Sequence, residues 1–151
     1  MDRRSMLSGF TRLACAVMPV SLLATRTEAA EQPPTMAKVA YHLSDLDKVD
    51  FVLGNIANHY SGMGGPDHVT IALVVNGPAL KAFHLEAASP DVTKNAAELH
   101  NLGLQLNACI NTMRAQNVTL KDLLPGFNVA EKGGVVRLAE LQSQGYAYLR
   151  P

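Results

Sequence analysis

The sequence predicts an α/β fold in which a largely parallel sheet is covered by helices on both faces. Segments of strand character alternate with amphipathic helical segments over residues 38–149, and this alternation favours parallel strands joined by right-handed crossovers. Residues 68–75 carry an almost continuous β-branched run, which is typical of a strand buried on both faces. The 151 residues, 48% of them hydrophobic, suffice for one domain with a core but not for two.

The first half of the domain predicts two strands and two helical segments. Residues 38–43 are short and mostly apolar, as in a buried strand. Over residues 46–60 the apolar side chains recur at three- and four-residue spacing, which predicts a helix. A glycine-rich break then leads to the second strand, residues 68–75, and a turn leads on to a short helical segment over residues 79–84.

The second half repeats the alternation after a loop over residues 86–92. Glycines and polar turns punctuate it and set the ends of the elements. The predicted helices cover residues 93–102, 111–116 and 135–144. The predicted strands cover residues 104–110, 127–130 and 146–149.

The first thirty residues have the layout of an export signal. Arg3 and Arg4 precede an apolar stretch over residues 13–24, and small residues follow it. The paired arginines resemble a twin-arginine signal, although such pairs also occur in ordinary secretory signals. We therefore divide the chain into a signal peptide, a linker and one folded domain, over residues 1–30, 31–37 and 38–151.

This export prediction bears on location and on the cysteines. The apolar stretch is shorter than the roughly 20 residues that span a bilayer, so we expect a periplasmic or otherwise exported protein without a permanent membrane anchor. Cleavage near residue 30 removes Cys15 and leaves Cys109 as the single cysteine. A lone thiol in an oxidising compartment is uncommon, so the position of Cys109 carries information.

The charge balance argues against nucleic acid as a partner. The chain has 13 Lys and Arg against 13 Asp and Glu, so no net positive field attracts a polyanion. It has no Trp, with only 4 Tyr and 4 Phe, which gives little support to a base-stacking surface. We expect no nucleic-acid binding.

Cys109 is the strongest candidate for chemistry. It falls at the junction of a predicted strand and a predicted helix, where Asn111 and Thr112 supply a possible cap. A sulfur at a helix amino terminus gains from the macrodipole and from unpaired N–H groups, and both favour the nucleophilic thiolate. His42 and Asn76 also fall at carboxyl ends of predicted strands, where ligands bind in open parallel sheets.

These neighbours suggest supporting roles. His42 is the candidate to accept the thiol proton or to pair with the thiolate. Asn76 or Asn111 is a candidate to donate hydrogen bonds to a transferred sulfur or to an oxyanion. The alternative is that Cys109 is a small buried hydrophobe and that His42 is structural.

Other kinds of site find little support. No His-x-x-x-His or Cys-x-x-Cys spacing is present, so we expect no metal site. Glycine-rich nucleotide motifs and the Gly-x-Ser-x-Gly elbow of hydrolases are also missing. Asp45 and Asp47 flank a helix start and are interpreted as caps rather than catalytic acids.

Four segments together resemble the DsrE/DsrF-like family, and the resemblance extends over nearly all of the predicted domain. They read KVAYH, VVNG, LQLNACINTMR and GGVVRLAELQSQGYAYLRP, at residues 38–42, 74–77, 104–114 and 133–151. The resemblance implies a three-layer α/β/α domain with a mainly parallel five-stranded sheet, often assembled as a trimer or hexamer. In the DsrE and TusD components of sulfur relays, a cysteine after the third strand carries a persulfide, and Cys109 matches that position.

Three functions follow as hypotheses. The first is an exported sulfur carrier or sulfurtransferase that needs no cofactor and exchanges sulfane sulfur with donor and acceptor proteins or small sulfur compounds. Because the relay proteins act in the cytoplasm, an exported relative implies a different donor and acceptor. The second is a non-catalytic oligomeric module that binds a small ligand near His42, Asn76 and Cys109, and the third, weaker one is a flavodoxin-like redox carrier.

Overall fold

A computed structural model of the chain describes residues 36–151. The predicted signal peptide, Cys15 and residues 31–35 of the predicted linker lie outside the described residues. The first strand begins at Ala37, the last residue assigned to that linker. No helix in the described part is long and apolar enough to cross a membrane.

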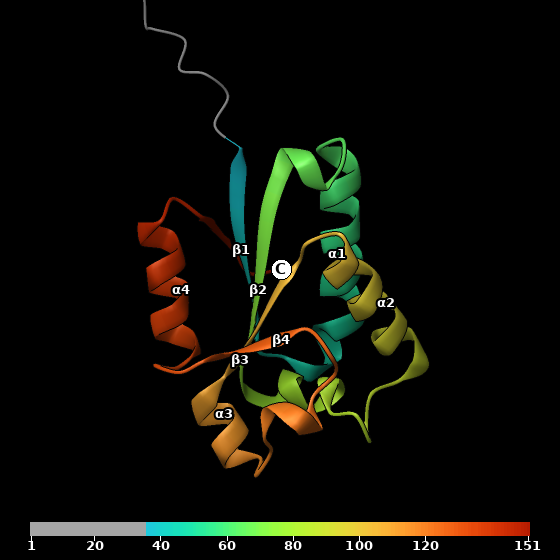
Figure 1. Ribbon diagram of the computed structural model, residues 1–151, viewed down its shortest axis with the longest axis vertical. Helices are drawn as coiled ribbons and strands as arrows, with labels where there is room; N and C mark the ends of the chain where they lie inside the picture. Colours follow the sequence, from blue (N-terminus) through green and yellow to red (C-terminus); the bar gives the residue numbers. More distant parts are fainter. Residues whose placement is uncertain (1–35) are drawn as a thin grey trace, which may run out of the picture. The chain divides into compact units, whose positions relative to one another are not determined.

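The centre of the domain is a sheet of five strands, all parallel, in the order β4-β3-β2-β1-β5. The strands are β1 (Ala37–Leu43), β2 (Val69–Val75), β3 (Gln105–Cys109), β4 (Phe127–Ala130) and β5 (Ala147–Leu149). Helices lie on both sides of the sheet, so the predicted three-layer α/β/α fold is confirmed (Figure 1).

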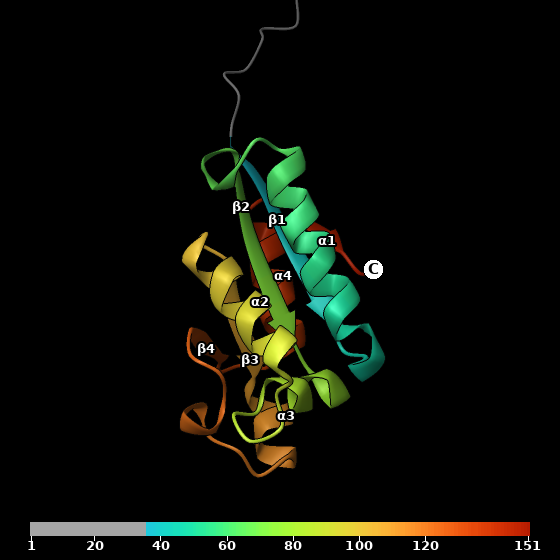
Figure 2. The ribbon, with the colours of Figure 1, turned by 90° about the vertical axis from the view of Figure 1, so that its right-hand side faces the viewer.

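The helices divide unequally between the two faces. They are α1 (Val49–Gly62), α2 (Pro90–Asn101), α3 (Ile110–Ala115) and α4 (Gly134–Ser143). Both views place α1 and α2 together on one face and α4 on the other (Figures 1 and 2). The short α3 follows β3 directly, beyond the carboxyl end of the sheet.

The core is correspondingly asymmetric. The main cluster lies between the sheet and the α1/α2 layer and includes fully buried residues such as Leu73, Phe83 and Leu106. Beneath α4 there is a much smaller cluster of Ala40, Ala72, Val74, Leu138 and Leu141. α4 packs mainly against β1, β2, β3 and β5, and a groove lined in part by Asn128, Val129 and Ala130 of β4 stays open beside it.

Most boundaries lie within two residues of the sequence-based expectation, and three segments differ from it more clearly. The helix predicted from residue 93 begins at Pro90, because the Ser89 side chain accepts the Val92 N–H at 3.1 Å and proline suits the first turn of a helix. The helix predicted over residues 46–60 opens with a separate 3-10 turn, Leu46–Lys48. The segment predicted over residues 79–84 is a 3-10 helix, Gly77–Phe83.

Two predicted helix caps form differently from the expectation. Asp45 takes the capping position of the 3-10 turn, but its carboxylate accepts no backbone N–H there and instead pairs with Arg150 at 3.6 Å. Asn111 and Thr112 lie inside α3, and Cys109 itself is the residue that precedes the helix.

Candidate functional site

Cys109 is the last residue of β3 and the residue before α3. Its backbone is extended, with φ −68° and ψ 120°, so the chain turns from strand to helix directly after the sulfur. It is a free cysteine with 6% of its surface exposed. The Cys109 side chain therefore lies at the carboxyl edge of the sheet but is almost completely buried.

The sulfur is surrounded by hydrogen-bond donors from two segments that are far apart in sequence. Burial alone would raise the pKa of Cys109, but hydrogen bonds from the Thr112 and Gly134 N–H groups, the Thr112 hydroxyl and the Asn111 N–H hold it below its usual range. Asn111 and Thr112 belong to the first turn of α3, and Gly134 is the first residue of α4. The site therefore favours the thiolate.

The Thr112 hydroxyl has a defined orientation. Its oxygen accepts the Gly77 N–H at 2.9 Å, so its single proton is free to point at the Cys109 sulfur. Gly77 follows β2, and its carbonyl accepts the Gln116 side-chain amide at 2.9 Å. The loop after β2 thus holds the donor that faces the thiolate.

Two consecutive glycines let α4 approach the sulfur. A Cβ at Gly134 would lie 3.2 Å from the Cys109 Cβ and 3.5 Å from its Sγ. At Gly133, φ is +99°, and a Cβ would lie 2.9 Å from the Asn111 Nδ2. Gly133 therefore provides the turn, and Gly134 provides the close contact with the sulfur.

His42 and Asn76 meet, but His42 does not pair with Cys109. The His42 Nε2 lies 3.2 Å from the Asn76 Oδ1, and its Nδ1 lies 2.8 Å from the Tyr148 hydroxyl. An amide oxygen only accepts, so the hydrogen bond to Asn76 requires a proton on the His42 Nε2. Asn76 is the nearer neighbour of the site, since its Cβ lies 3.5 Å from the position of a Cβ on Gly134.

Of the four candidates, the structure thus brings Cys109, Asn76 and Asn111 around Gly133–Gly134 and places His42 behind Asn76. Asn111 contributes its backbone N–H to the sulfur, while its side chain lies beside Gly133. Among residues 36–151, no group of three or more His, Cys, Asp or Glu side chains is arranged to hold a metal ion.

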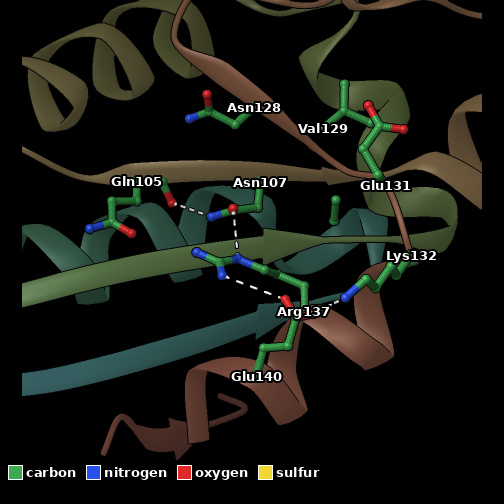
Figure 3. Close-up of a pocket in the computed structure, with 10 residues that line it drawn as sticks. Gln105, Asn107, Asn128, Val129, Glu131, Lys132, Arg137 and Glu140 are labelled. Carbon is green, nitrogen blue, oxygen red and sulfur yellow. Dashed lines mark hydrogen bonds and ion pairs between the residues drawn. The ribbon is translucent and has the colours of Figure 1, made fainter. Parts of the chain in front are cut away.

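A polar groove opens on the α4 face of the sheet, beside this site (Figure 3). Its volume is about 450 Å³, and its wall includes Ala130 and Gly133. Arg137 donates from Nε to the Asn107 Oδ1 at 3.2 Å, and Glu140 lies 3.8 Å from Arg137 and 3.2 Å from Lys132. Ala130 pairs with Cys109 across the β3–β4 ladder, so the groove reaches the neighbourhood of the sulfur.

Sequence reasoning missed several residues of the site. The sequence pattern predicts a cap at Thr112 and a break before a helix at Gly134, but it assigns neither residue to the surroundings of the sulfur. The Gly-Gly pair was the available signal, because adjacent glycines directly before a helix are typical of a close backbone approach. Arg137 and Asn107 gave no signal, because their contact joins a helix to a strand 30 residues away.

Comparisons with known proteins bear on the fold. No protein-family model matches the chain, and no curated protein matches it. Among solved structures, the chain is similar to the protein of unknown function MTH1491 from Methanobacterium thermoautotrophicum, with 26% identity, a TM-score of 0.67, and coverage of 76% of this chain and 99% of that one.

Two further solved structures share the architecture. The ychN protein from E. coli is 12% identical with a TM-score of 0.60, covering 78% of this chain and 100% of that one. The conserved protein of unknown function BT1422 from Bacteroides thetaiotaomicron is 19% identical with a TM-score of 0.57, covering 76% and 94%. These likenesses support the three-layer fold.

Proposed function

We propose that this protein is an exported sulfur carrier that accepts sulfane sulfur on Cys109 as a persulfide and passes it to an acceptor thiol. The observation that carries the proposal is the set of donors around the sulfur: three backbone N–H groups and one hydroxyl lower the pKa of a thiol that burial alone would raise. A thiolate is the nucleophile in sulfur exchange. The resemblance to the DsrE/DsrF-like family supports the same assignment.

The exchange needs no external oxidant or reductant. The Cys109 thiolate attacks the outer sulfur of a donor persulfide, R–S–SH. A new S–S bond forms to Cys109, the donor's S–S bond breaks, and the donor leaves as the thiolate R–S⁻ while the proton stays on the transferred sulfur. An acceptor thiolate then attacks that outer sulfur and regenerates the Cys109 thiolate.

The same donors serve both halves of this cycle. The persulfide of Cys109 is itself an anion when ionised, and N–H groups aimed at the sulfur stabilise negative charge without a bound cation. Asn76 has its oxygen engaged by His42, so the amide nitrogen is the part of this side chain that remains to donate to a transferred sulfur. In this proposal His42 and Tyr148 orient Asn76 rather than remove a proton.

Intact-mass measurement after incubation with inorganic polysulfide tests the proposal. We expect a gain of one or more sulfur atoms that a reductant removes and that Cys109→Ser does not show. Thr112→Ser, which keeps the hydroxyl, is the matched control and should load like the wild type. A wild-type protein that gains no sulfur while its thiol still reacts with a small alkylating reagent would refute the carrier role.

A second candidate, a non-catalytic module that binds a small ligand, is favoured by the 6% exposure of Cys109. A thiol with so little exposed surface is not freely accessible to small reagents in the folded protein. The discriminating measurement is alkylation at neutral pH: a thiol that resists small reagents until the protein unfolds supports the binding module, and one that reacts in the folded state supports the carrier.

The proposal includes export and self-assembly. The charged and apolar layout of residues 1–30 supports export, and amino-terminal sequencing of protein from the periplasmic fraction tests it. Assembly as a trimer or hexamer rests on the family resemblance, and light scattering coupled to gel filtration measures it. Membership of the family is part of the same proposal.

A further inference from the structure

The groove beside α4 lies on the same face of the sheet as Cys109. Alternate residues of a strand face the same side, so Gln105, Asn107 and Cys109 form one row along β3. Asn107 contacts Arg137 of α4, and the Cys109 sulfur contacts the start of the same helix. Two residues of strand span about 6.6 Å, which is comparable to the reach of a small amino-acid persulfide from its carboxylate to its outer sulfur.

The charges along the groove are mixed rather than of one sign. Arg137 and Lys132 supply two cations, and Glu131 and Glu140 supply two anions. The remaining polar lining consists of the carboxamides of Gln105, Asn107 and Asn128. A dianion such as thiosulfate would meet both carboxylates, and an apolar ligand would displace water from these polar groups without replacing its hydrogen bonds. A ligand with one carboxylate and one ammonium group complements both charge types.

Arg137 is held in place by a buried amide. Asn107 is 5% exposed, and its Nδ2 donates to the carbonyls of Gln105 at 3.0 Å and Leu73 at 3.4 Å. These two bonds fix the Asn107 Oδ1 toward the Arg137 Nε.

The outer edge of the Arg137 guanidinium still has N–H groups that can donate hydrogen bonds to a ligand. Its Nη1 lies 3.8 Å from Glu140, which is longer than a hydrogen bond. Figure 3 shows the Glu140 carboxylate shared between Arg137 and Lys132. A ligand carboxylate can therefore form the paired bonds for which a guanidinium is suited.

We propose that this groove binds the carboxylate and ammonium groups of a small zwitterionic thiol of the amino-acid type, which presents its persulfide to Cys109. Arg137 binds the carboxylate, and Glu131 or Glu140 binds the ammonium group. The cavity of about 450 Å³ lies within the usual range for small-molecule sites. The inference rests on the proposed function, because it names the donor class for the sulfur exchange described above.

Loading kinetics with four donors test the inference. The probes are inorganic polysulfide and the persulfides of cysteine, of cysteamine, which lacks the carboxylate, and of 3-mercaptopropionate, which lacks the ammonium group. We expect the wild type to load fastest from cysteine persulfide among the three organic donors. Equal rates from all three would overturn the inference while leaving the carrier role intact.

Variants of the groove separate binding from chemistry. Arg137→Met should slow loading from cysteine persulfide about 10- to 100-fold, the range for lost hydrogen bonds to a charged group, and should leave loading from polysulfide unchanged. Lys94→Met, which changes an exposed lysine of α2 outside the groove, is the matched control and should load normally from both donors. A loss that is equal for both donors, or no loss with either, would overturn the inference.

Two further measurements keep the test decisive. If Arg137→Met fails to fold, Arg137→Lys replaces it, because lysine keeps the positive charge beside Glu140 but cannot form the paired bonds to a carboxylate; an unchanged rate from cysteine persulfide then overturns the inference. Binding of S-methylcysteine to Cys109→Ser, followed by NMR, needs no sulfur transfer. Shifts confined to the groove support the inference even if polysulfide loading fails, and no shift at millimolar ligand overturns it.

Discussion

Replacing Gly133 by alanine tests whether the start of α4 controls the Cys109 thiolate. The backbone at Gly133 has φ +99° and ψ 158°, a region that residues with a side chain rarely adopt, at a cost of about 1–3 kcal/mol. The new Cβ would also lie 2.9 Å from the Asn111 Nδ2. Because Asn111 is exposed, its side chain can move away at little cost, so backbone strain dominates the loss.

The expected loss of about 1–3 kcal/mol is measured by urea unfolding, and it corresponds to a melting-temperature shift of about 3–5 °C for each kcal/mol in a domain of this size. Relief of the strain rotates the peptide before Gly134, whose N–H faces the sulfur. We therefore expect the pKa of Cys109 to rise in this variant, so that alkylation slows at neutral pH and recovers in alkaline buffer.

Gly103→Ala is the matched control. Gly103 has the same φ of +99°, but a Cβ there meets nothing within 4 Å, and it lies before β3 rather than beside the sulfur. The Gly103→Ala protein should lose a similar amount of stability, and the alkylation of Cys109 should keep the pH profile of the wild type. A Gly133→Ala protein whose thiol titrates like the wild type, despite the loss of stability, would refute the assignment of α4 to thiolate stabilisation.

Four other predictions concern the thiol, a helix cap and the small core. Thr112→Val removes the hydroxyl donor, so the alkylation profile of Cys109 should move to higher pH, and an unchanged profile would contradict the hydrogen bond. Since hydrogen bonds lower the folded pKa of Cys109 from its usual value of 9.0, ionisation of Cys109 adds stability that is fully present above about pH 9. That gain over Cys109→Ser, measured by urea unfolding, should disappear as the pH falls through the folded pKa; a pH-independent difference would count against it. Ser89→Ala should cost about 1 kcal/mol in urea unfolding by removing the α2 cap, and Leu141→Ala about 2–5 kcal/mol by opening a cavity beneath α4; losses near zero would contradict either assignment.

The strands and most helix ends were predictable because their signals are local. The β-branched run of β2 and the glycine after α2 each identify an element without reference to the rest of the chain. The position of Cys109 followed for the same reason, since an apolar run meets polar helix-starting residues there. The predicted start of α2 is three residues late because the predicted loop over residues 86–92 includes Pro90, although Ser89 and Pro90 together are typical of a helix beginning.

The surroundings of Cys109 were not predictable, because they depend on strand order. Parallel pairing of β3 with β4 brings Ala130 beside Cys109, and only then does the following turn place Gly134 against the sulfur. The expected pairing of His42 with Cys109 assumed that side chains at the same sheet edge meet. In the structure β2 lies between β1 and β3, so Asn76, which follows β2, separates the two.

The choice of donors has a chemical consequence for the proposed carrier. A thiolate stabilised by an imidazolium loses its partner when the histidine deprotonates near neutral pH, whereas N–H groups and a hydroxyl do not titrate in that range. The donors around Cys109 belong to α3 and to the first residue of α4, so the thiolate keeps its partners when the pH of the surroundings changes. For the proposed exported carrier, a buried sulfur held by fixed dipoles satisfies two demands together: donors that do not titrate stabilise its thiolate, and its 6% exposure limits access by oxidants that would carry the thiolate beyond the reversible states.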